Sequence, residues 1–344
     1  MERIGLVLAG GGGKGAYQIG VWKYLEECGL AQHICAVSGT SVGALNAAMF
    51  SAGNYDAAEH IWINIAPNKI LSPKEIEIEK IVENLIIALG ACLLNDPIVL
   101  DASIGMLKSH IAYALEKMLR RNYMFSREGL VEIMDNEVDF PAICNSLIPC
   151  YATCLNLSNG KPQRFLLNEQ SADNIKKILL ASSAIPVVFD TVNVEGTNYY
   201  DGGIPIIGDN VPIQPLYDLG IENIIVVQLD QETPVDKSKY PNSRIIEIVP
   251  SEKLGGLIDG TLDFNSEGAV KRIEHGYEDA KSVFGTFVET VKIEKINQIL
   301  MNCFCKEETE FQRNRQMISE KREALKLQKA NDGFDEMLKD LGCK

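Results

Sequence analysis

Two strand–turn–helix units follow one another within residues 4–52, and this repetition constrains the fold more than any other feature of the sequence. Ile4 to Ala9 is an uninterrupted apolar run, typical of a strand buried on both faces, and helical spacing over Ala16 to Cys28 follows it. A second short strand, Ile34 to Val37, leads into a helix of small residues over Ala44 to Ala52. Because strands joined through helices run parallel, the sequence predicts an α/β fold with a mainly parallel central sheet.

The rest of the chain continues this alternation and then becomes helical. We interpret the mostly helical stretch of about residues 54–136 as an insertion, and helix dominates from Thr261 onward. With 344 residues, 46% of them hydrophobic, the chain can form one large core. We expect one domain over residues 1–290 and a charged helical tail over residues 291–344. The later strand segments are Leu147–Leu155, Phe165–Leu167, Asn198–Tyr200, Ile221–Leu229 and Ile245–Val249.

Charge and cysteine usage limit the setting in which such a chain works. The 33 basic and 47 acidic residues give a net charge of −14, which repels phosphate backbones and argues against a nucleic-acid partner. The 9 cysteines are scattered without a CxxC pair, which favours reduced thiols and no metal site. No run reaches the roughly 18 apolar residues of a membrane span, and the opening residues lack a basic leader. We therefore expect a cytoplasmic protein, with peripheral membrane contact left to a local apolar or basic face.

A G-x-S-x-G pattern, Gly39-Thr40-Ser41-Val42-Gly43, lies between the second strand and the helix after it. In hydrolases a serine at such a turn is held in a strained backbone conformation at the start of a helix, and the glycines let strand and helix approach closely. The bare pattern also fits an ordinary turn rich in small residues. Its context, a buried strand before and a small-residue helix after, favours Ser41 as a nucleophile.

A run of glycines, Gly10-Gly11-Gly12-Gly13-Lys14-Gly15, follows the first strand directly. Such a run leaves several backbone N–H groups pointing into one concavity, which can hold a phosphate or the oxyanion of a reaction intermediate. A dinucleotide fingerprint also requires an acidic residue near the end of the second strand, where Ala36-Val37-Ser38 has none. A P-loop would need glycine at Leu8 and serine or threonine at Gly15. The oxyanion interpretation therefore fits best, because a serine nucleophile follows on the next strand.

A third motif, Asp201-Gly202-Gly203, follows a strand-like segment. A carboxylate within hydrogen-bond reach can act as general base for a serine, although D-G-G alone is also a common turn. Of the 4 histidines only His275 lies after Asp201, so it alone can complete the Ser–Asp–His order of α/β hydrolases. At this point the base is either Asp201 by itself or Asp201 together with His275.

Together the three motifs resemble the patatin-like phospholipase family in its bacterial form. They appear in the family's order, and the resemblance extends over roughly residues 4 to 285. It implies a three-layer α/β/α sandwich in which Ser41 is the nucleophile and Asp201 the only base. It also implies an oxyanion hole built from the backbone N–H groups of Gly11, Gly12 and Gly13, with no metal and no cofactor. The supporting residues that it implies are Gly10, Lys14, Gly15, Gly39, Gly43, Gly202 and Gly203.

These observations predict a serine lipid acyl hydrolase, similar to a phospholipase A or lysophospholipase, that forms an acyl-enzyme on Ser41. Its substrate would be a lipid or a membrane surface, and the helical tail could engage a protein partner or a second copy. One alternative is an α/β-hydrolase-type esterase using Ser41, Asp201 and His275, which the early position of Ser41 in the chain disfavours. The others are a non-catalytic protein that binds a lipid or a partner, and a nucleotide-binding protein.

Overall fold

The computed structural model divides the chain into two compact units, Met1–Val283 and Phe284–Lys344. The central part of the predicted insertion, residues 66–127, lies outside the described residues. Within the part of the chain that is described, no helix is long and apolar enough to cross a membrane. The structure describes residues 3–65, 128–186, 189–204, 207–232 and 234–340.

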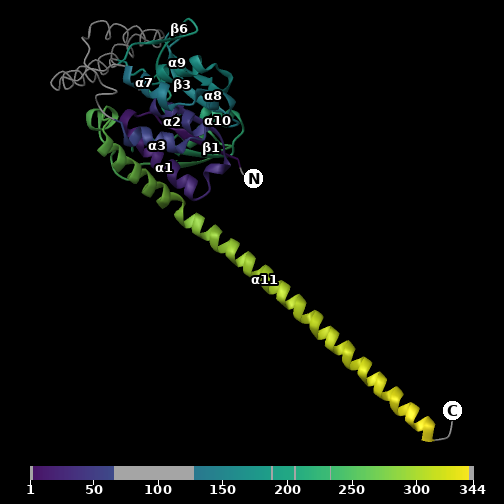
Figure 1. Cartoon of the computed structure of the whole chain (residues 1–344). Helices are drawn as coiled ribbons and strands as arrows, with labels where there is room; N and C mark the ends of the chain where they lie inside the picture. Colours follow the sequence, from purple (N-terminus) through teal and green to yellow (C-terminus); the bar gives the residue numbers. More distant parts are fainter. Residues whose placement is uncertain (1–2, 66–127, 187–188, 205–206, 233, 341–344) are drawn as a thin grey trace. The chain divides into compact units, whose positions relative to one another are not determined.

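A mixed sheet lies at the centre of the first unit (Figure 1). Among the described residues it has eight strands, in the order β5-β6-β3-β2-β1-β7-β8, and β4 pairs with β3 outside this path. Strands β3, β2, β1, β7 and β8 are parallel neighbours, whereas β4, β5 and β6 are antiparallel additions. The strands are β1 (Ile4–Leu8), β2 (Ile34–Thr40), β3 (Cys150–Asn156), β4 (Lys161–Leu166), β5 (Val192–Val194), β6 (Thr197–Asp201), β7 (Asn223–Val227) and β8 (Arg244–Ile248).

Helices pack on both faces of this sheet, since successive side chains of a strand point to opposite sides. Leu6 and Leu8 of β1 lie on one face, against side chains of α1 and α2 such as Ile19 and Phe50. Val7 lies on the other face, in a buried cluster that includes Leu216 of α10. The helices are α1 (Ala16–Glu27), α2 (Val42–Ser51), α3 (Tyr55–Ile63), α7 (Glu128–Glu137), α8 (Phe140–Asn145), α9 (Ala172–Ser182), α10 (Gln214–Asp218) and α11 (Ser266–Asp340).

The three layers confirm the predicted α/β/α architecture, while the antiparallel edge was not foreseen. β4 spans Lys161–Leu166, so it begins well before the predicted segment Phe165–Leu167. β5, Val192–Val194, has only three residues and was missed, because so short a strand offers no alternation to detect. The sheet is therefore parallel at its centre and mixed at the edge where β6 joins β3.

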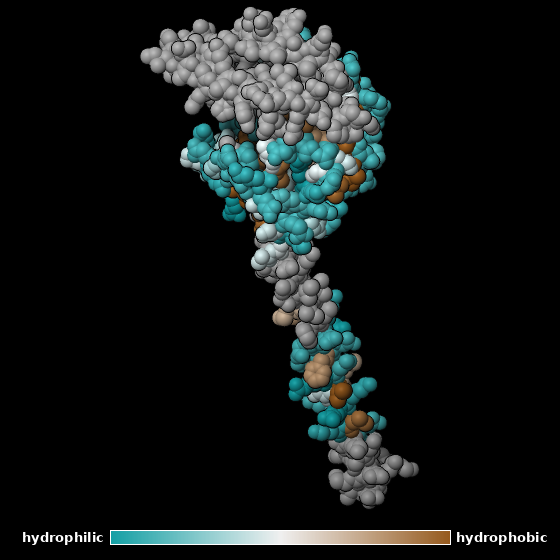
Figure 2. All heavy atoms as spheres, turned by 90° about the vertical axis from the view of Figure 1, so that its left-hand side faces the viewer, coloured by the Kyte–Doolittle hydropathy of each residue, from teal (hydrophilic) through white to brown (hydrophobic). Residues whose placement is uncertain are grey.

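The second unit contains the greater part of α11, because the boundary between the units falls within this helix. Between residues 301 and 327 exposed apolar side chains are interspersed with charged ones (Figure 2). The tail is thus helical as far as Asp340, and the expected domain boundary at residue 290 stays a prediction. Among the residues of this unit whose side chains are described, the large exposed apolar ones are Met301, Phe311, Met317, Ile318, Leu325 and Leu327.

Candidate active site

Ser41 occupies a sharp turn between β2 and α2, and its backbone is strained. Its φ of 57° and ψ of −128° form a combination that a residue with a side chain rarely adopts. The turn needs glycine on both sides, because a Cβ on Gly39 would collide with the carbonyl oxygen of Gly43. A Cβ on Gly43 would likewise meet the carbonyl oxygen of Leu8 in β1. The G-x-S-x-G pattern therefore forms the expected nucleophile-type turn.

A buried serine of α9 holds this turn in place. The backbone N–H of Ser41 donates a hydrogen bond of 2.9 Å to Oγ of Ser182. The hydroxyl of Ser182 in turn donates to the carbonyl oxygen of Thr153 in β3, at 2.7 Å. Ser182 thus links the turn to the neighbouring strand, a role that no motif in the sequence announces.

The side chains of Ser41 and Asp201 form a direct hydrogen bond, although 160 residues separate them in sequence. Ser41 Oγ donates to Asp201 Oδ2 at 2.6 Å, while Asp201 Oδ1 accepts from the backbone N–H of Gly203 at 2.7 Å. Asp201 is the last residue of β6, and pairing with Cys154 of β3 fixes its position beside the turn. Both side chains belong to residues that are only 5% exposed. The structure thus brings together the predicted nucleophile and the predicted base.

Burial sets the proton affinity of this carboxylate. Desolvation raises the pKa of Asp201 to about 6, and the hydrogen bonds from Ser41 and from the Gly203 N–H partly oppose that rise. A general base works best when its pKa lies close to the working pH, since it is then ionised yet still basic. The environment of Asp201 therefore suits proton abstraction near neutral pH.

The glycine run lies directly beside the nucleophile. A Cβ on Gly10 would stand 3.1 Å from the Cβ of Ser41. The N–H of Gly10 donates to the carbonyl oxygen of Asn210 at 3.2 Å, and Asn210 Nδ2 returns a bond of 3.3 Å to Gly10 O. Within the described chain, the N–H groups of Gly11, Gly12 and Gly13 donate no hydrogen bond to the protein. Such unpaired N–H groups are compatible with an oxyanion hole, and that role of the three glycines stays a prediction. Gly15 packs against Val42.

Lys14 lies within the same run, in the short 3-10 helix Gly12–Gly15. Burial lowers the pKa of Lys14 below its usual value, Asp230 opposes this effect, and Arg272 adds to it. The Lys14 side chain packs near Gly260, on the segment behind the glycines. Its position fits the expected support of the loop rather than contact with the dyad.

Asp209 and Asn210 connect the three motifs to one another. The N–H of Asp209 donates to the carbonyl oxygen of Gly202 at 2.7 Å, and Thr40 Oγ1 donates to the carbonyl oxygen of Asp209 at 2.7 Å. Asn210 holds Gly10 through the two bonds described above, and a Cβ on Gly203 would contact Asn210 Oδ1. Sequence reasoning gave these residues no role.

His275 lies in a different hydrogen-bond network. Its Nε2 lies 2.8 Å from Ser251 Oγ and 3.1 Å from Asp279 Oδ2, and its ring packs edge-on against Tyr17. Asp201 makes its hydrogen bonds with Ser41 and Gly203 instead. The geometry therefore gives no support to a Ser41–Asp201–His275 triad. In the described part of the chain, no group of three or more His, Cys, Asp or Glu side chains is placed to hold a metal ion.

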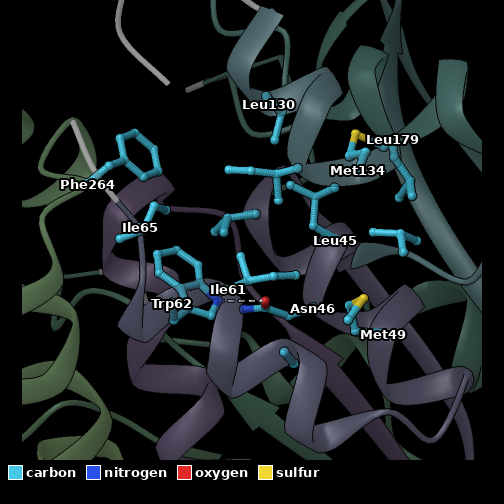
Figure 3. A pocket seen from close by; sticks show the side chains of 14 residues that line it. Leu45, Asn46, Met49, Ile61, Trp62, Ile65, Leu130, Met134, Leu179 and Phe264 are labelled. Carbon is cyan, nitrogen blue, oxygen red and sulfur yellow. Dashed lines mark hydrogen bonds between the residues drawn. The ribbon is translucent and has the colours of Figure 1, made fainter. Parts of the chain in front are cut away.

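An apolar pocket runs along α2, beginning at the residue after the nucleophile (Figure 3). Val42, Leu45 and Met49 contribute its floor at helical spacing, and the helices at the two ends of the predicted insertion, α3 and α7, contribute its walls. Asn46, which lines the pocket, accepts a hydrogen bond from Trp62 Nε1 at 3.2 Å. The other lining residues are Ala58, Ile61, Trp62, Ile65, Leu130, Ile133, Met134, Val138, Leu179 and Phe264.

The α/β/α sandwich carries a strained serine with a buried carboxylate hydrogen-bonded to it. Beside them lies a glycine loop whose N–H groups have no partner among the described residues. This combination is typical of a serine hydrolase that uses a Ser–Asp dyad. The family model for patatin-like phospholipases matches residues 6–217, and the chain belongs to that family. A shorter similarity, 50% identity over 48 residues, joins it to lysophospholipase nte1 of Aspergillus terreus. That match spans 14% of this chain and 3% of the fungal protein.

Solved structures that align with this structure share little sequence identity with the chain. VipD from Legionella pneumophila is 17% identical, with a TM-score of 0.49 over 83% of this chain and 67% of VipD. The type III effector ExoU of Pseudomonas aeruginosa is 18% identical, with a TM-score of 0.39 over 84% of this chain and 54% of ExoU. Human GIVD cytosolic phospholipase A2 is 8% identical, with a TM-score of 0.38 over 85% and 59% of the two chains.

Proposed function

We propose that the protein hydrolyses fatty-acyl esters of lipids, with Ser41 as nucleophile and Asp201 as general base. The observation that carries this proposal is the hydrogen bond of 2.6 Å between Ser41 Oγ and Asp201 Oδ2 in a buried site. Membership of the patatin-like phospholipase family supports the same class of reaction. The dyad needs no histidine, because the carboxylate reaches the hydroxyl directly.

In the first half of the reaction, the Asp201 carboxylate accepts the hydroxyl proton as Ser41 Oγ attacks the ester carbonyl carbon. The negative charge moves to the carbonyl oxygen, where the N–H groups of Gly11, Gly12 and Gly13 donate to it. Collapse of this intermediate breaks the bond to the alcohol, which leaves with the proton from Asp201. In the second half, water attacks the acyl-enzyme, Asp201 takes the water proton and returns it to Ser41, and the fatty acid leaves.

The apolar pocket along α2 favours a lipid substrate. Its floor starts at Val42, next to the nucleophile, and its polar side chain Asn46 is already engaged by Trp62 and Gln18. Apolar surface of this kind gains free energy when it replaces water with hydrocarbon, about 25 cal/mol per Å². We assign the pocket to the acyl chain of the scissile ester, which leaves the alcohol portion of the lipid outside it.

The test is fatty-acid release from mixed phospholipid and lysophospholipid micelles, and from a p-nitrophenyl ester, by wild type, Ser41→Ala and Asp201→Asn. Each variant is expected to lose at least about a thousandfold in kcat, as for other activated nucleophiles and their bases. Ser183→Ala and Asp279→Asn are matched controls, since they make the same kinds of change at buried residues outside the dyad: loss of a hydroxyl and replacement of a carboxylate by an amide. Wild-type rates in either dyad variant would reject the proposal.

We further propose a cytoplasmic location, peripheral contact with lipid surfaces, and a protein partner or second copy on the helix of the second unit. Phe311, Ile318 and Leu325 recur every seven residues there and are 59%, 55% and 57% exposed. An apolar stripe of this period is typical of helix pairing. Sedimentation velocity of wild type against the triple serine variant tests self-association, and fractionation of cells tests the location. A monomer mass for wild type as well as for the variant would reject self-association through this helix.

A further inference from the structure

A buried arginine contacts the glycine loop from the far side of the site. Arg272, in the second turn of α11, is 8% exposed. Its Nη1 donates to the carbonyl oxygens of Gly13, at 3.3 Å, and Asp263, at 3.1 Å. Its Nη2 donates to the carbonyl oxygen of Asp259 at 3.0 Å and to Asp263 Oδ2 at 2.8 Å. One guanidinium group thus joins the glycine loop, the start of α11 and the segment between them.

The segment that Arg272 holds is in direct contact with the loop. A Cβ on Gly12 would collide with the carbonyl oxygen of Thr261, and a Cβ on Gly13 with that of Asp263. The loop and this segment therefore pack backbone against backbone, with no space for a side chain between them. Any shift of residues 259–263 is transmitted to the glycines.

The glycine loop needs an external restraint of this kind. Glycine has more backbone freedom than any other residue, and a peptide that rotates turns a carbonyl oxygen to where an N–H was. The hydrogen bonds of a charged guanidinium group are charge-assisted and stronger than those between neutral groups. An arginine at this depth is stable only when its N–H groups are paired, so its position and that of its acceptors are mutually fixed.

We infer that Arg272, held by Asp263, is a positioning residue that keeps the N–H groups of the glycine loop directed at the oxyanion of the reaction on Ser41. Both residues lie beyond residues 6–217, so the part of the chain outside the family match completes the active site. The inference rests on the proposed function, because it concerns an oxyanion that only acyl transfer produces.

The experiment compares Arg272→Lys, Arg272→Met and Asp263→Asn in the full chain, using p-nitrophenyl butyrate. Oxyanion donors act mainly in the transition state, so kcat should fall about 10- to 100-fold while KM changes less than about twofold. Lysine keeps the positive charge but lacks the planar guanidinium group. The fall in kcat should therefore be smaller for Arg272→Lys than for Arg272→Met. The acidic limb of the pH profile should keep its apparent pKa, since Asp201 is untouched.

Two neighbours on α11 serve as controls. Lys271→Met removes the same charge from an exposed ion pair with Glu267, so kcat should be unchanged. Ile273→Ala removes a buried side chain from the same turn without touching the loop, and it calibrates the effect of lost stability. Its melting temperature should fall while kcat of the folded fraction stays near wild type.

The inference is overturned if folded Arg272→Met and Asp263→Asn keep kcat within twofold of wild type, or if only KM changes. It is also overturned if Ile273→Ala loses as much kcat as the Arg272 variants when its stability is lowered to the same extent. It is also rejected if none of the three test variants folds, because the pair would then serve folding only. Wild type and Ser41→Ala are assayed in parallel. An inactive wild type counts against the proposed function, whereas an active wild type with unaffected Arg272 variants counts against this inference alone.

Discussion

The backbone N–H of Ser41 donates its hydrogen bond to the hydroxyl of Ser182, 141 residues away in sequence. This bond engages the strained residue itself, so it opposes relaxation of the turn. The position of the nucleophile is therefore controlled from a helix that carries none of the three motifs.

Ser182→Ala should lower kcat about 10- to 100-fold, since a small displacement of a reacting group is costly. It should also lower the free energy of unfolding by about 1–3 kcal/mol, because the Ser41 N–H and the Thr153 carbonyl lose a buried partner. Ser183→Ala is the control, since among the described residues that hydroxyl bonds the carbonyl oxygens of Leu179 and Leu180 in the adjoining helix. Ester hydrolysis and urea unfolding measure both quantities, and a wild-type kcat in Ser182→Ala would contradict the role.

The pH dependence of hydrolysis should report the ionisation of Asp201. The base must be ionised to accept a proton, so kcat/KM should fall as the pH drops through about 6, the pKa to which burial raises this carboxyl. The measurement is a kcat/KM profile from pH 4 to pH 8 on a substrate without ionisable groups. Asp279→Asn should show the same fall of kcat/KM on the acidic side of the profile. A fall centred near pH 4 in wild type would show that the Asp201 carboxylate is not desolvated.

Asp201→Asn should stabilise the fold at neutral pH. The folded state has the raised pKa, so between pH 3.8 and about 6 it binds more protons than the unfolded chain, and stability falls as the pH rises through that window. Removing this ionisation should add about 1–3 kcal/mol to the free energy of unfolding at pH 7.5, and little at pH 4. Denaturant unfolding at both values tests this, and an equal gain at both would point to another cause.

Gly43→Ala should disrupt the turn that carries the nucleophile. Its Cβ would overlap the carbonyl oxygen of Leu8, and overpacking of this kind costs about 1–3 kcal/mol with displacement of the backbone. Both melting temperature and kcat should fall. Gly53→Ala is the control, because Gly53 has a φ of 69° but nothing within 4 Å of its Cβ position. It should cost about 1 kcal/mol in strain and leave kcat unchanged.

Leu45→Trp should shorten the acyl chains that the enzyme accepts, because the indole would fill the pocket beside α2. The ratio of kcat/KM for a palmitoyl ester to that for a butyryl ester should drop at least about tenfold, as expected when apolar burial of several methylenes is lost. Leu219→Trp, at an exposed position after α10, is the control. An unchanged ratio in Leu45→Trp would remove the pocket from the proposal.

Local patterns predicted the layers of the fold, whereas the pairing of Ser41 with Asp201 was expected from the family resemblance of the three motifs and not from any one pattern. Buried runs such as Ile4 to Ala9 announce central strands, and glycines that exclude a Cβ mark the close contacts around the nucleophile. The antiparallel edge was less accessible, since a three-residue strand such as Val192–Val194 has no detectable period.

The residues that support the site were not predictable from one sequence. Ser182, Asn210 and Arg272 act through contacts with segments distant in the chain, and none of them belongs to one of the three motifs. An arginine in a helix is most often a surface residue, and only the fold shows that Arg272 is buried behind the glycines. Tertiary pairing, rather than local composition, determines such positions.

The position of Asp201 at the end of β6 has a consequence for the birth of the protein. Ser41 is synthesised 160 residues before Asp201, and β6 must pair with β3 before the two side chains can come into contact. Until β6 has paired with β3, Ser41 therefore lacks its contact with Asp201. The proposed dyad is a property of the completed sheet and not of either segment alone.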